Sequence, residues 1–148
     1  MTPTLVRFAA ALAALPLGAA VGPAPTGEVA VAVSGLRSTR GLVQACLTRL
    51  STAFPDCRSD PAARRLTVPA ASAAAIRFTA LPPGRYAVAL LHDENGNGRA
   101  DMALMVPREG FGFSRNPAAR LGPPRFGKAA FAVALDPVNV TIRMRYLL

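Results

Sequence analysis

Residues 81–101 read LPPGRYAVALLHDENGNGRAD, and this stretch decides the fold that we expect for the chain. Between 85 and 92 every second residue falls on one face, the period of a half-buried β-strand. The residues on that face are Tyr86, Val88, Leu90 and His92. Turn-forming residues, Pro-Pro-Gly and Asn-Gly-Asn-Gly, lie before and after the strand. The stretch therefore predicts a strand between two turns, with the face of Tyr86 in the core.

The same period of two recurs on both sides of this strand. Further strands are expected at 28–34, 42–48, 70–78, 129–135 and 138–146. The last two are separated by Asp136 and Pro137 and are expected to form a hairpin. Asp60 followed by Pro61 predicts a single helical turn at 61–64. About seven short strands without a long helical period indicate an all-β fold, a single antiparallel β-sandwich of immunoglobulin-like or transthyretin-like type.

The N-terminus has the pattern of a signal peptide. A basic Arg7 precedes an apolar run, and the small residues Gly18 and Ala20 fit a cleavage site after Ala20. The expected organisation is a signal peptide, a flexible segment and a β-sandwich domain, at 1–20, 21–27 and 28–148. No other apolar run is long enough to cross a bilayer, so the mature chain is expected to lack a transmembrane segment. We expect a periplasmic or secreted protein.

The chain is basic, with 17 Lys+Arg against 8 Asp+Glu in 148 residues. Removing the leader removes Arg7 and no acid, so the mature charge is 16 − 8 = +8. The arginines are scattered along the chain rather than clustered, and nucleic acid is therefore not an expected partner. A weak attraction to an anionic cell-surface polymer stays open.

The two cysteines, Cys46 and Cys57, are expected to form a disulfide, because an exported chain meets an oxidising compartment. A bridge over so short a loop stabilises the fold by somewhat under ~3 kcal/mol on the chain-entropy estimate. A redox-active pair would instead use the closer CxxC spacing.

The acidic tract 93–101 matches much of a calcium-binding loop. Side-chain oxygens and one carbonyl, that of Arg99, fall where an EF-hand has ligands. The candidate ligands are Asp93, Asn95, Asn97, Arg99 and Asp101. Leu104 stands where a bidentate Glu belongs, so a site would be weak or would use a carboxylate such as Glu109. The alternative is a turn stabilised by its own Asp and Asn side chains.

Two residues of this region have enzymatic and structural interpretations. His92 ends a core face, which favours a structural histidine bonded to the loop backbone. Ser114 with His92 and Asp93 makes a triad by composition only, because no nucleophile elbow surrounds the serine. A hydrolase is accordingly the least favoured function.

Residues 107–128 form a long stretch without periodicity, PREGFGFSRNPAARLGPPRFGK. Loops of this length are usually functional or disordered, and Phe111, Phe113 and Phe126 argue against disorder. The rings are expected to fold back as a lid over one end of the sandwich, or to form a ligand or partner surface. The residues of that candidate surface are Phe111, Phe113, Arg115, Asn116, Arg120 and Arg125.

Two tracts together, LPPGRYAVALLHDENGNGRAD and PREGFGFSRNPAARLGPPRFGKAAF, resemble the bacterial family of domain of unknown function 2141 (DUF2141). The resemblance covers nearly the whole mature chain. It implies export and a β-sandwich, and it implies no activity. A shorter and weaker likeness joins LPPGRYAV and DENGNG to the B-repeats of cell-surface adhesins, in which a related acidic loop binds calcium.

These observations favour an exported, non-enzymatic binding or structural module, with calcium as the one candidate cofactor. It would act on an envelope protein, a polymer or a small ligand. The alternative is a binder of a small molecule or an envelope polymer through the 107–128 loop, with Phe rings stacking on the ligand and arginines pairing with its acidic groups.

Overall fold

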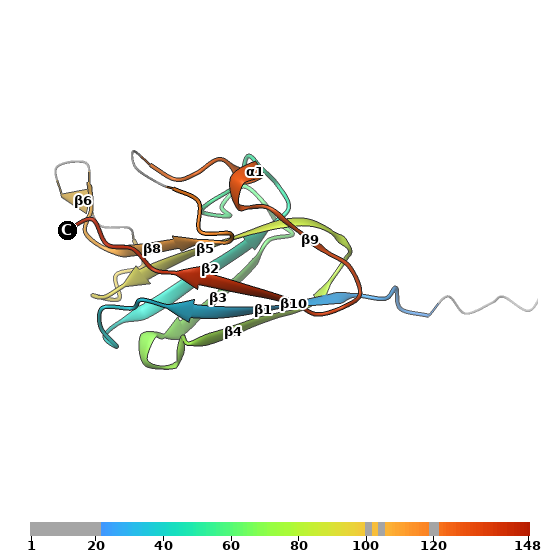
Figure 1. The fold of residues 1–148 in the computed structure, drawn as a ribbon, viewed down its shortest axis with the longest axis horizontal. Helices are drawn as coiled ribbons and strands as arrows, with labels where there is room; N and C mark the ends of the chain where they lie inside the picture. The colour runs from blue at the N-terminus through green and yellow to red at the C-terminus, as the bar shows by residue number, and fades with distance from the viewer. Residues whose placement is uncertain (1–21, 100–101, 104–105, 119–121) are drawn as a thin grey trace, which may run out of the picture.

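The structure is a computed structural model that describes residues 22–99, 102–103, 106–118 and 122–148. Two β-sheets lie face to face (Figure 1). The smaller sheet has the order β10-β1-β4, from Val138–Arg143, Gly27–Ser34 and Ala75–Leu81. This confirms the all-β sandwich. The predicted signal peptide at 1–20 lies outside the described residues.

The larger sheet has the order β3-β2-β5-β8, and β9 also pairs with β5. Its strands are Arg64–Pro69, Leu42–Thr48, Gly84–Asp93, Gly110–Phe113 and Phe131–Val133, in the order β3, β2, β5, β8 and β9. The short strands β6 (Met102–Ala103) and β7 (Val106–Pro107) pair with each other. The short helical segments within the described ranges are η1 (Ala70–Ser72) and α1 (Phe126–Ala129). No helix among the described residues is long and apolar enough to cross a membrane.

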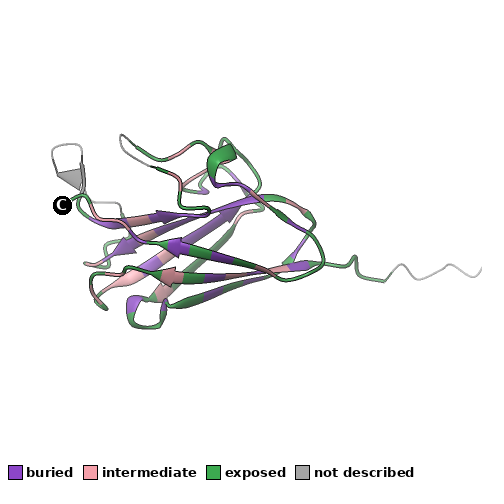
Figure 2. Ribbon diagram, in the orientation of Figure 1, coloured by how far each residue is buried: buried purple, intermediate pink, exposed green. Residues whose placement is uncertain are grey.

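The core lies between the two sheets, and the alternating residues of the sequence fill it as predicted (Figure 2). The larger sheet contributes Val43, Ala45, Leu47, Tyr86, Val88 and Leu90. The smaller sheet contributes Val29, Val31, Ile76, Phe78, Val140 and Ile142. Because successive side chains of a strand point to opposite faces, the intervening residues of both sheets form two outer faces.

The predicted hairpin of 129–135 with 138–146 is wrong. β9 pairs with the first residues of β5, and β10 crosses to the other sheet, where it pairs with β1 in parallel. The physical reason is the length of β5, because β8 covers only 89–92 of its edge. The backbone groups at 84–86 need their own partners, and β9 supplies them. The other ladders are antiparallel.

Two local predictions, the helical turn at 61–64 and the strand at 70–78, need correction. The helical turn at 61–64 is a short turn, and Arg64 already begins β3, a strand that the sequence pattern did not indicate. Asp60 still caps the turn, because its side chain accepts a hydrogen bond from the N–H of Ala62 at 2.8 Å. The strand predicted at 70–78 begins as η1 and becomes extended only from Ala75.

The segment 107–128 is not a structureless loop. β8 lies within it and pairs with β5, and α1 begins near its end. Phe111 and Phe113 are therefore strand residues. β8 also meets the chain beyond β10, where Phe111 and Arg145 exchange two backbone hydrogen bonds.

Gly41 and Gly96 provide a matched test of this architecture, because their φ angles are +71° and +70°. A Cβ on Gly41 would lie 2.6 Å from the Cα of Glu94, whereas a Cβ on Gly96 would meet nothing within 4 Å. Gly96→Ala is expected to cost only the ~1–2 kcal/mol of left-handed strain. Gly41→Ala is expected to cost at least ~2 kcal/mol more, measured by urea unfolding. Equal losses would contradict this contact.

Candidate functional site

The outer face of the larger sheet is covered over one part and open over another. A small second cluster of Ala87, Ala89, Phe113 and Ala129 lies on this face. Phe54 covers it, with its ring centroid 5.8 Å from that of Phe113 and 6.1 Å from that of Phe126. Phe113 and Phe126 thus pack under the segment between β2 and β3, and do not form the predicted lid over one end of the sandwich.

A disulfide fixes this covering segment to the sheet. Cys46 lies on the outer face of β2 and bonds Cys57, with 5.9 Å between the Cα atoms, which confirms the predicted pair. A second tie joins the buried hydroxyl of Thr48 to Asp60 at 2.6 Å. This hydrogen bond is the main cause that lowers the pKa of Asp60 below its usual value. The segment that contains Pro55, Asp56 and Arg58 is therefore tied to β2 through Cys57 and Asp60.

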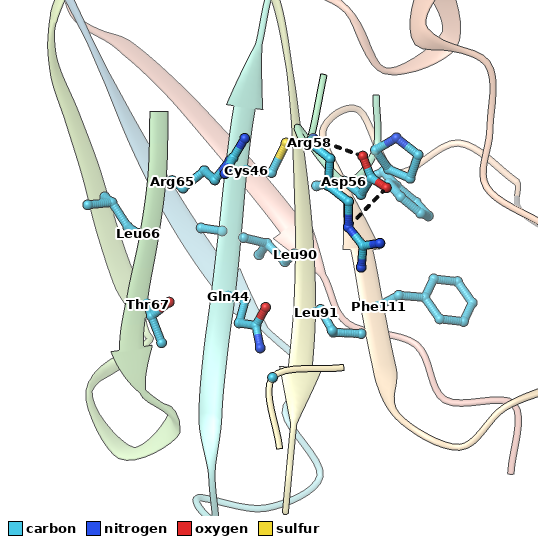
Figure 3. Close-up of a pocket in the computed structure, with 15 residues that line it drawn as sticks. Gln44, Cys46, Asp56, Arg58, Arg65, Leu66, Thr67, Leu90, Leu91 and Phe111 are labelled. Atoms are coloured by element: carbon cyan, nitrogen blue, oxygen red, sulfur yellow. Dashed lines mark hydrogen bonds and ion pairs between the residues drawn. The ribbon is translucent and has the colours of Figure 1, made fainter. Parts of the chain in front are cut away.

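Beyond the covered part, the outer face is hollowed into a groove of about 390 Å³ (Figure 3). Its floor consists of two rows of side chains that cross the same four strands. The first row is Thr67, Gln44, Leu91 and Phe111, and the second is Arg65, Cys46, Ala89 and Phe113. Neighbours within such a row lie about 4.5–5.5 Å apart at Cβ, so each row is a continuous surface.

The groove has two different ends. At one end lie Pro55, Asp56 and Arg58 of the disulfide-tethered segment, and the other end includes Gly98 of the acidic loop. The small side chain of Ala89 also lines the groove. We call this feature the outer-face groove. Its volume falls within the ~300–1,000 Å³ of ordinary small-molecule sites.

Two arginines and one carboxylate give the groove its charge. Arg65 donates a hydrogen bond to the carbonyl of Cys57, which fixes its guanidinium beside the disulfide. Arg58 lies 3.5 Å from Asp56 through its Nε, and its side chain is 81% exposed. Exposed ion pairs of this kind contribute little to stability, so Arg58 can exchange Asp56 for another anion at small cost.

Of the six residues predicted to form a binding surface, the described structure places two in the groove, Phe111 and Phe113. Arg115 donates to the carbonyl of Ala130, and Asn116 bonds the backbone of Thr141 and Arg143. Arg125 is exposed just before α1, and Arg120 lies outside the described residues. The arginines that line the groove, Arg58 and Arg65, were missed because no pattern in the sequence brings β3 and its preceding segment onto the same outer face as β8.

The acidic loop forms the other end of the groove, and Asp93 organises it. The buried Asp93 carboxylate accepts hydrogen bonds from the N–H of Asn97 at 3.1 Å and of Gly98 at 2.7 Å. It also accepts one at 3.1 Å from the side chain of Gln44, on the groove floor. Asn95 accepts one from the N–H of Asn97 at 3.0 Å, so the loop has the self-bonded turn that was the alternative to calcium.

The calcium prediction itself stays a prediction. In the described part of the chain, no three His, Cys, Asp or Glu side chains are grouped as ligands for a metal ion. The predicted ligands Asn95, Asn97 and Arg99 are exposed in the same loop as Asp93. Asp101 and Leu104 lie outside the described residues, and Glu109 is buried at 4% exposure.

His92 and Ser114 have separate structural roles. The fully buried His92 ring bonds the carbonyl of Arg40 at 2.8 Å and the hydroxyl of Tyr146 at 2.7 Å. Ser114 donates to the carbonyl of Ala129 at 2.6 Å and accepts from the N–H of Val88. Both His92 nitrogens are thus engaged elsewhere, and the two side chains do not assemble with Asp93 as a triad.

Arg37 ties the acidic loop to the C-terminal segment. Its guanidinium bonds Glu94 at 2.6 Å, the carbonyl of Arg108 at 3.0 Å, and the carbonyl of Leu148, and it lies 4.4 Å from the Tyr146 ring centroid. Hydrogen bonds from Arg37 and then Ser38 lower the pKa of Glu94 to about 2. Desolvation is the main cause that raises the pKa of Tyr146.

The lowered pKa of Glu94 predicts a pH-dependent contribution to stability. Because the folded-state pKa lies below the ordinary 4.5, the contribution is present above pH 4.5 and is lost as the pH falls toward about 2. Glu94→Gln is expected to lose about 1–2 kcal/mol at pH 7, since Arg37 is partly exposed. Urea unfolding of both proteins should show this difference shrinking below pH 4.5. A difference that is constant down to pH 2 would refute the ion pair.

Comparison with known proteins gives a family and no function. Neither a curated protein nor a solved structure matches this chain. One family model matches residues 31–141, from the middle of β1 to the middle of β10, and so spans both sheets and the outer-face groove. The chain belongs to the family described as uncharacterized protein conserved in bacteria, DUF2141.

Proposed function

We propose that this protein is an exported, non-enzymatic binding module that takes a small ligand, or one unit of a polymer, in the outer-face groove. The observation that carries the proposal is the groove floor. Two four-residue rows form the floor of a groove of about 390 Å³, and the residues that line this groove combine two aromatic rings, aliphatic groups and two arginines. Small-molecule sites usually have this composition, largely apolar with a few convergent polar groups.

The way the groove is built also favours binding. A sheet floor holds its side chains on a rigid frame, and the disulfide Cys46–Cys57 fixes the segment above it, so little ordering is needed when a ligand arrives. The leader-like residues 1–20 and the disulfide favour an exported protein. This proposal keeps the predicted role of Phe111 and replaces Arg115, Arg120 and Arg125 by Arg58 and Arg65.

Amide chemical-shift mapping with a library of small organic fragments tests the proposal. Fragment hits are expected to shift the amides of β2, β5 and β8 that line the groove. Phe111→Ala removes most of the stacking surface and is expected to weaken the best hits about tenfold, as the loss of ~1.4 kcal/mol would do.

Two exposed threonines provide matched controls for this experiment. Thr67 lies on the groove floor, and Thr141 lies on the outer face of the other sheet. Thr67→Ala should change the affinity of hits that reach β3, and Thr141→Ala should change none. Hits that are spread over the surface, or that respond to Thr141→Ala alone, would contradict a groove-based function.

Calcium binding by the acidic loop is the second candidate. It rests on the spacing of Asp93, Asn95, Asn97 and Asp101 and on a loop that turns through positive φ at Gly96 and Gly98. Millimolar calcium is expected to raise the thermal midpoint relative to chelator, because calcium at ten times its Kd adds about 1.4 kcal/mol to the free energy of unfolding. Asp101→Ala should abolish the rise. A midpoint that is indifferent to calcium would leave a self-bonded turn.

A further inference from the structure

The outer-face groove is amphipathic across its strands, and this narrows the class of ligand. Along the first row, Thr67 and Gln44 on β3 and β2 are polar, whereas Leu91 and Phe111 on β5 and β8 are apolar. Gln44 donates to Asp93 through its side-chain nitrogen. Among the described residues nothing donates to its side-chain oxygen, which stays available as an acceptor. A ligand that covers the row must therefore have an apolar face and a polar edge side by side.

Sugar rings have this combination. The axial C–H groups of a pyranose form an apolar face that stacks on an aromatic ring, and its hydroxyls lie around the edge. Phe111 is half-buried and lies at the apolar end of the row, with its ring beside β8 (Figure 3). A ring seated on Phe111 and Leu91 would direct hydroxyls toward Gln44 and Thr67.

The net positive charge of the groove favours a sugar ring that carries an anionic group. Two arginines and one carboxylate line the groove, which leaves a net charge of +1. The Arg58 side chain extends from the tethered segment across β5 toward Leu91 and Phe111 (Figure 3). Arg65 is fixed at the other side of β2, beside Cys46. Arg58 thus reaches the floor on which the ring would lie, whereas Arg65 adds positive charge from the second row, beside Cys46. Guanidinium and carboxylate groups match in geometry.

Asp56 is the anionic group that Arg58 contacts within the protein. Its carboxylate lies 3.5 Å from the Nε of Arg58, and both side chains are more than half exposed. The protein's own carboxylate therefore competes for the arginine that a ligand would use. We infer that the outer-face groove binds a hexuronic acid unit, with its ring on Phe111 and Leu91 and its carboxylate at Arg58. This inference rests on the proposed function of the groove.

Isothermal titration of the purified, disulfide-bonded protein at low salt tests the inference with three sugars. They are galacturonate, trigalacturonate and the neutral maltotriose. An acidic sugar is expected to bind at least about tenfold tighter than maltotriose, with an affinity that falls as salt rises. If trigalacturonate binds more tightly than galacturonate, the natural ligand is an acidic polysaccharide. If the two bind equally, it is a free sugar acid.

Charge variants with opposite expected effects separate the role of each group. Arg58→Gln is expected to weaken galacturonate binding about tenfold, the loss of one charge-assisted contact. Asp56→Asn should tighten it about threefold, because it removes the competing carboxylate and keeps an oxygen for the N–H of Arg58. Arg125→Gln changes an exposed arginine that does not line the groove and should have no effect.

The outcomes distinguish this inference from the proposed function. Equal binding of maltotriose, or Arg58→Gln without effect, would overturn the uronic acid assignment. If fragments map to the groove and neither acidic sugar binds, the assignment fails and the binding function stands. If neither fragments nor sugars bind the groove, both fail. Thermal unfolding of each variant checks that the fold is retained.

Discussion

The whole structure depends on β5, which is paired along both edges and buried on its core face. β2 covers one edge, and β8 and β9 share the other. Its core face carries Tyr86, Val88 and Leu90, which meet the smaller sheet. Because every second side chain must point the other way, the same strand places Ala87, Ala89 and Leu91 on the outer face. The core and the candidate site are thus two faces of one strand.

The groove on the outer face is the part of the larger sheet that its neighbouring segments leave uncovered. The alanines of β5 leave room above the sheet, and the segment between β2 and β3 fills only part of that room with Phe54. The disulfide and the hydrogen bond of Asp60 to Thr48 stop this segment from extending farther across the sheet. The acidic loop, fixed by Asp93 and by Arg37 through Glu94, limits the other end. What stays open between them is the groove.

Local pattern predicted much of the fold. The faces of 28–34, 42–48 and 85–92 and the disulfide followed from period two and from cysteine count, because burial on one face imposes that period. The partner of β9, the existence of β3 and the groove arginines did not follow. The pairing of β9 depends on which part of the β5 edge is free. Arg58 and Arg65 line the same groove as Phe111 only because four strands pair side by side. Single-strand periodicity contains no information about either.

The central claim is that ligand binding takes place on the outer face of the larger sheet. A crystal structure of the protein grown with trigalacturonate tests it most directly. The account predicts a sugar ring stacked on Phe111, with its carboxylate within hydrogen-bonding distance of Arg58. A sugar bound on the outer face of the smaller sheet, or around Arg115 and Arg125 with the groove empty, would contradict it.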